Sequence, residues 1–118
     1  MYTIRIIQQS TISNYSLNNQ RDLISDTAEN LTQVGQWSMK DFQKEKEQIT
    51  LYLMLTRKNL TALATFPLSS AFMTTFQQCC KSYDNLEAEF QAGVVDQKAW
   101  AKAMIELGEK LTKNIHLI

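Results

Sequence analysis

The longest uninterrupted apolar run in the chain is Leu51-Tyr52-Leu53-Met54-Leu55. A helix that carries this run has no polar face for about one and a half turns, so neighbouring elements have to surround it. The spacing of apolar residues around the run predicts one helix over about 39–65, with its apolar line formed by Phe42, Ile49, Leu53, Leu60 and Leu63. Ser38 and Asp41 resemble a capping box at its start.

The same segment also fits a buried strand over residues 48–56. A run of this length does not distinguish a buried helix from a buried strand by periodicity alone. Leu and Met outnumber β-branched residues here, and Ala62 and Ala64 follow, so the composition favours a helix.

Two further helices have regular apolar stripes. Helices are predicted over 70–92, from Phe72, Phe76, Cys79, Tyr83, Leu86 and Phe90, and over 97–115, from Trp100, Met104, Leu107, Leu111 and Ile115. Pro67 precedes the first of them, Ser69 or Ser70 can cap it, and Gly93 can end it. Asp96 can cap the second. The short link between the two predicts an antiparallel hairpin.

The N-terminal third has a thinner apolar pattern. Leu17, Ile24 and Leu31 recur every seven residues and predict a helix over about 17–35. Within residues 1–13, Tyr2, Ile4 and Ile6 alternate with Thr3 and Arg5, which is the period of a strand. We expect an arm or a short strand there, although this segment could also extend the first helix.

These elements predict a single all-α domain, a four-helix up-and-down bundle with an N-terminal arm. The alternative fold is α+β, with short strands near 2–7 and 48–56. Three glycines and one proline among 118 residues favour long helices with few turns.

Charge and hydropathy narrow the classes of partner. Twelve basic residues balance twelve acidic ones, so the chain lacks the positive field that attracts proteins to nucleic acids. No apolar run approaches the roughly 18 residues of a membrane span. The first residues do not resemble a secretory signal, so we expect a cytoplasmic protein that binds neither nucleic acid nor membrane.

Residues suited to catalysis or metal binding are scarce. The single histidine is His116, and the two cysteines, Cys79 and Cys80, are adjacent, which provides no zinc-binding spacing. No helix carries the Glu-x-x-His pair of di-iron bundles, and three scattered glycines form no phosphate-binding loop. We therefore expect a non-enzymatic protein with no metal and no cofactor.

Two surfaces remain as candidates for binding a protein partner. The first is acidic and lies towards the tip of the last hairpin; it consists of Asp84, Glu87, Glu89 and Asp96. It could meet a basic partner surface, or Lys40, Lys44 and Lys46 could neutralise it. The second is the apolar surplus of Leu51, Tyr52, Met54 and Leu55, which exceeds what a four-helix bundle buries. Self-association into a homodimer is the simplest explanation for this surplus.

The sequence thus favours a protein-binding module that acts by covering a surface. The most concrete hypothesis is an immunity or inhibitor-type protein that neutralises a toxin or enzyme. A secretion chaperone or adaptor is an alternative. Another is a sensor that holds a small apolar ligand between helices, at Tyr52, Phe76, Tyr83 and Trp100.

Overall fold

The computed structural model describes the backbone of residues 2–118 and the side chains of residues 19–118. Its elements are α1 (Tyr2–Asp41), α2 (Lys46–Leu63), α3 (Ser70–Ala92), α4 (Gln97–Asn114) and a 3₁₀ turn, η1 (Ile115–Leu117). No strand occurs in residues 2–118, so the predicted all-α class is confirmed and the α+β alternative is wrong. Residues 48–56 are helical because Ile49, Leu53 and Leu60 bury one helical face.

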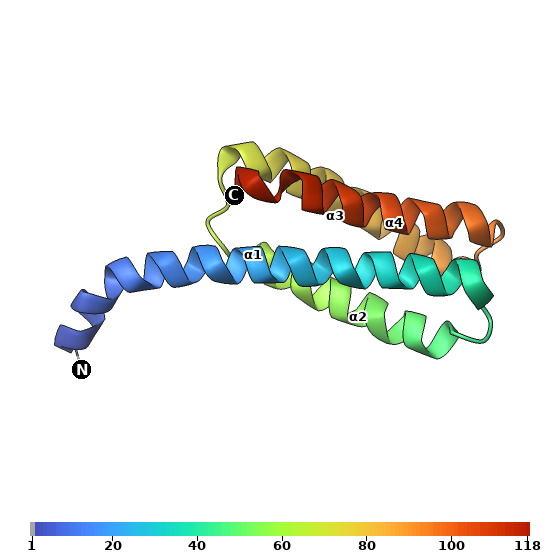
Figure 1. The fold of residues 1–118 in the computed structure, drawn as a ribbon, viewed down its shortest axis with the longest axis horizontal. Coiled ribbons are helices and arrows are strands. Elements are labelled where there is room, and N and C mark those ends of the chain that lie inside the picture. The colour runs from blue at the N-terminus through green and yellow to red at the C-terminus, as the bar shows by residue number, and fades with distance from the viewer. Residues whose placement is uncertain (1) are drawn as a thin grey trace.

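Successive helices run in opposite directions and form an up-and-down bundle (Figure 1). Helix α1 packs closely against α4 and also against α2, while α3 packs against α4. The molecule is 56 Å long and 28 Å by 20 Å across. Helix α1 accounts for this length, because its first turns project beyond the ends of the other three helices (Figure 1).

The core runs along the axis of the bundle and receives side chains from all four helices. Its largest fully buried members include Trp100, Tyr83 and Phe72. Trp100 is 5.6 Å from Phe90 and 5.8 Å from Phe42, measured between ring centroids, and its Nε1 donates to the Leu86 carbonyl at 2.9 Å. This aromatic group closes the end of the core near the α3–α4 hairpin.

The start of α1 differs from the sequence prediction. Residues 2–13, expected as an arm or a short strand, form the first turns of α1, and Met1 lies outside the described residues. A strand needs a hydrogen-bonded neighbour, and residues 2–118 contain none. Continuing an existing helix backwards needs no such neighbour, because each added residue bonds within the helix.

The end of α1 also differs, and with it the start of α2. The first helix was predicted to end at Gly35, yet α1 continues to Asp41, and Gly35 is buried against α4. Ser38 was predicted to cap the second helix, but it lies inside α1, where its hydroxyl donates to the Val34 carbonyl at 2.7 Å. Helix α2 starts at Lys46 without a side-chain cap.

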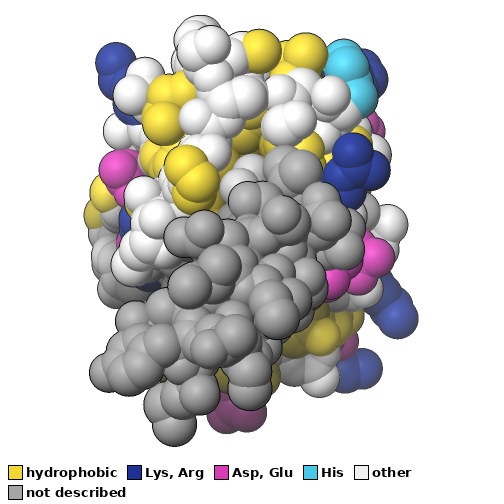
Figure 2. Space-filling view, turned by 90° about the vertical axis from the view of Figure 1, so that its left-hand side faces the viewer, with side chains coloured by type: hydrophobic (Ala, Val, Ile, Leu, Met, Phe, Trp, Pro, Cys, Tyr) yellow, Lys and Arg dark blue, Asp and Glu magenta, His cyan; other side chains and the backbone are white. Residues whose placement is uncertain are grey.

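The end of the bundle opposite the α3–α4 hairpin is closed by half-buried hydrophobic residues. They are Phe66, Leu68, Ile115, Leu117 and Ile118. Ser69 caps α3 by accepting from the Phe72 amide at 3.1 Å, and its hydroxyl donates to the Leu117 carbonyl at 2.5 Å. Figure 2 looks onto this end, where hydrophobic side chains lie among polar ones and the one histidine, His116, is exposed.

Candidate functional site on the outer face of α2

Helix α2 has one buried face and one exposed face. Its buried residues are Ile49, Leu53, Thr56, Leu60 and Leu63, all on the side towards the bundle. Helical spacing places Glu47, Leu51, Met54 and Lys58 on the opposite side, at successive steps of four, three and four residues. All four are exposed. We call these four residues, together with the adjacent Leu55, the outer stripe of α2.

The apolar run at 51–55 is divided between the core and this stripe. Leu53 is buried, whereas Leu51 is 52% exposed, Met54 64% and Leu55 39%. Tyr52 points towards α1, where its ring lies edge-on to that of Trp37, with 4.8 Å between the ring centroids. Three of the four predicted apolar binding residues therefore share one open surface, and Tyr52 belongs to the contact between α1 and α2.

The acidic residues do not gather at the hairpin tip as a free patch. Arg57 of α2 lies between Asp84 and Glu87 of α3, and its Nη2 donates to Asp84 Oδ1 at 2.7 Å and to Glu87 Oε1 at 2.8 Å. The Asp84 side chain is 60% exposed, so water screens that pair and its contribution to stability is small. The cluster links α2 to α3 through side chains.

Tyr83 connects this cluster to the core. Its hydroxyl lies 2.7 Å from the Leu53 carbonyl and 3.0 Å from Glu87 Oε2, two acceptors for its single hydrogen. Burial and the negative charge of Glu87 raise the pKa of Tyr83. Burial lowers the pKa of Arg57, but its hydrogen bonds to Asp84 and Glu87 outweigh this effect and raise that pKa overall. Both side chains therefore keep their protons at neutral pH.

The other two acidic residues lie apart from the cluster. Glu89 is exposed on α3, and Asp96 caps α4 by accepting from the Ala99 amide at 3.0 Å. Lys40, Lys44 and Lys46, which were expected to neutralise the acidic tip, form no ion pair within residues 19–118. Arg57 pairs with both Asp84 and Glu87 instead, and its single positive charge offsets only one of the two negative charges.

No family model, curated protein or solved structure matches the chain.

The adjacent cysteines differ in their surroundings, and both thiols are free. Cys79 is in the core, where burial raises its pKa to about 11. Cys80 is half-buried, and burial together with the charge of Asp84 raises its pKa as well. Because the thiolate is the reactive form, neither cysteine has the lowered pKa of a nucleophile or a redox-sensing thiol.

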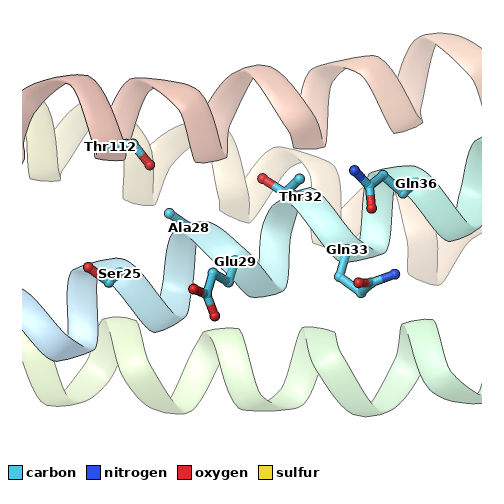
Figure 3. Close-up of a pocket in the computed structure, with 7 residues that line it drawn as sticks. All are labelled: Ser25, Ala28, Glu29, Thr32, Gln33, Gln36 and Thr112. Atoms are coloured by element: carbon cyan, nitrogen blue, oxygen red, sulfur yellow. The ribbon is translucent and has the colours of Figure 1, made fainter.

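The residues expected to hold a small ligand do not line an open cavity together. Phe76, Tyr83 and Trp100 are all part of the packed core. An open groove of about 440 Å³, lined mostly by polar residues, lies elsewhere, along α1, with Thr112 of α4 at its edge (Figure 3). Glu29 and Gln33 point away from Thr112, whereas Thr32 is directed towards α4, so these groups do not converge on one point (Figure 3).

Two kinds of feature, a cluster of metal ligands and a membrane-spanning helix, are absent from the described residues. Among them, no group of three or more His, Cys, Asp or Glu side chains is placed to hold a metal ion. No helix within that part of the chain has both the length and the apolar character needed to cross a bilayer.

Sequence reasoning missed Arg57, Glu47 and Lys58. Arg57 was given no role, because its two acidic partners come from a different helix. Glu47 and Lys58 continue the spacing of Leu51 and Met54, and a search for apolar residues alone passes over them. Testing for polar residues at the same helical spacing would have found both.

Proposed function

We propose that this protein is a non-enzymatic protein-binding module whose contact surface is the outer stripe of α2. The observation that carries the proposal is the exposure of Leu51, Met54 and Leu55 side by side on one helix. Isolated exposed hydrophobic residues are ordinary, but an exposed group of large ones usually marks a site of protein contact.

The spacing of the stripe favours a helical partner. Residues at i, i+3 and i+4 form the anchor pattern by which one helix lies against another or in a groove. Helix α2 is at the edge of the bundle, and its far side faces no other helix (Figure 1). An amphipathic helix can therefore approach along the full stripe without displacing α1 or α3.

Within this class, the most concrete role is an inhibitor or immunity-type protein that covers a toxin or an enzyme. The stripe would supply the apolar centre of such a contact, and exposed Glu89 would add a negative charge on α3. A chaperone or adaptor that shelters an apolar helix would use the same stripe. Identification of the bound protein distinguishes these roles.

Site-specific photo-crosslinking in the cells that naturally make the protein tests the proposal. A photoreactive aromatic amino acid replaces Met54, and the matched control carries it at Ser82, which is exposed on α3. We expect protein adducts from position 54 at a yield at least about tenfold above that from position 82. Equal yields from the two positions, or no adduct from position 54, would contradict the proposal.

A further inference from the structure

We infer that the helix for which the outer stripe is built is α2 of a second copy of this chain, bound antiparallel. This inference rests on the proposed function, because it names the partner of the same surface. It is carried by the order of residues along the stripe: an acidic residue, Glu47, at one end, the apolar pair Leu51 and Met54 in the centre, and a basic residue, Lys58, at the other end.

Antiparallel pairing matches this order to itself. If a two-fold axis passes between residues 52 and 53, Leu51 of one chain lies opposite Met54 of its partner. About the same axis, Glu47 of one chain lies opposite Lys58 of the partner at one end of the stripe. Symmetry repeats this contact at the other end. The alternating steps of four and three residues along the stripe are those of the a and d positions in a helix–helix seam. A two-fold axis then brings the same stripe of both chains into contact.

Other arrangements are disfavoured by the same charges. Parallel pairing sets Glu47 against Glu47 and Lys58 against Lys58, which are like-charge contacts. Sliding the antiparallel pair by seven residues removes the contact between Leu51 and Met54 and places a charged residue opposite an apolar one. The charged ends therefore specify both the direction and the register of the pair.

The two charges are available for an intermolecular contact. Glu47 and Lys58 are about 17 Å apart along α2, too far to pair with each other. Neither forms an ion pair with any residue of the described range 19–118. Thr61, the next residue of the same seam, is small and exposed, so a second helix can approach closely there.

The stripe is short, so the dimer should be weak and reversible. It presents fewer side chains than the twenty or so that each partner contributes to a standard stable interface. Association should therefore be detectable only at high protein concentration. Sedimentation equilibrium at protein concentrations up to about 500 µM measures it.

Charge reversal provides the test. Glu47→Lys places lysine opposite Lys58 at both ends of the dimer, and Lys58→Glu places glutamate opposite Glu47, so each single change should weaken association by about tenfold or more. The double variant Glu47→Lys/Lys58→Glu restores opposite charges and should regain the wild-type dissociation constant within about threefold. Circular dichroism on each variant shows whether α2 is intact.

Mixing the two single variants gives a stricter test. One chain then carries two lysines on the stripe and the other two glutamates, so the mixed dimer should exceed either homodimer by at least about tenfold in affinity. A reversal of equivalent exposed charges away from the stripe, Glu109→Lys with Lys98→Glu, should leave association unchanged.

The outcomes separate this inference from the proposed function. A wild-type chain that remains monomeric at about 500 µM, or a double variant that fails to recover, overturns the self-pairing. If position 54 then crosslinks to a different protein in cells, the proposed function stands and only the second copy is excluded. If position 54 crosslinks to nothing, the proposed function fails as well.

Discussion

Replacing Gly108 by alanine is expected to destabilise the protein by about 2 kcal/mol, although alanine is the better helix former by about 1 kcal/mol. Gly108 is buried where α4 crosses α1. A Cβ atom at this position would lie 2.8 Å from the Ala28 carbonyl oxygen and 2.9 Å from Thr32 Oγ1. The carbonyl belongs to the backbone of α1, so the two helices have to move apart to accommodate a methyl group.

Urea denaturation followed by circular dichroism measures this effect. The matched control is Glu109→Ala, one residue further along α4 and exposed, which should change the free energy of unfolding by less than about 0.5 kcal/mol. A Gly108→Ala variant at least as stable as the wild type would mean that α1 and α4 lie further apart than described.

Replacing Trp100 by alanine is expected to cost about 3–5 kcal/mol, the largest effect of any single substitution considered for this chain. Trp100 is 2% exposed and contacts the rings of Phe42 and Phe90. Alanine would leave a cavity between α3, α4 and the α1–α2 turn, and it would also remove the donor to the Leu86 carbonyl. Since folded domains are stable by about 5–15 kcal/mol, this loss is a large part of the total.

The other tryptophan provides the control. Trp37 is half-buried and has its edge-on contact with Tyr52 on the side of α1. Trp37→Ala should therefore cost at least about 2 kcal/mol less than Trp100→Ala in the same denaturation experiment. Equal costs at the two positions would contradict the assignment of Trp100 to the centre of the core.

The hairpin of α3 and α4 could be predicted from sequence because its signals are local. Helix α3 ends next to Gly93, which has a positive φ of 103°, and Asp96 caps α4 through a residue three positions away. Such signals lie within a few residues of the features they control.

The boundary between α1 and α2 could not be predicted, because its signals were ambiguous. Gly35 resembles a helix end, but it is glycine because α4 approaches within a distance that excludes a side chain. Ser38 resembles a cap, yet a serine hydroxyl can equally bond the carbonyl four residues earlier inside a helix. Distinguishing these cases requires knowing which helix lies alongside, and no local pattern contains that information.

The candidate site was also predicted in part. The excess of apolar residues at 51–55 indicated an exposed surface, but the rotation of α2 decides which residues of the run are exposed and which are buried. Asp84 and Glu87 were identified as acidic, whereas their ion pairs with Arg57 depend on how α2 lies relative to α3. Residues that meet across two helices depend on tertiary register, which the sequence of either helix alone does not specify.

The central claim is that protein covers the outer stripe of α2 in the cell, and methionine oxidation tests it directly. Met54 is 64% exposed on the stripe, and Met39 is 48% exposed on α1, one turn beyond Gly35 on the side towards α4. In dilute purified protein, both should be oxidised by peroxide at comparable rates. In intact cells, we expect the oxidation rate of Met54, relative to that of Met39, to be lower than in dilute protein. An equal ratio of the two rates in both settings would contradict the account.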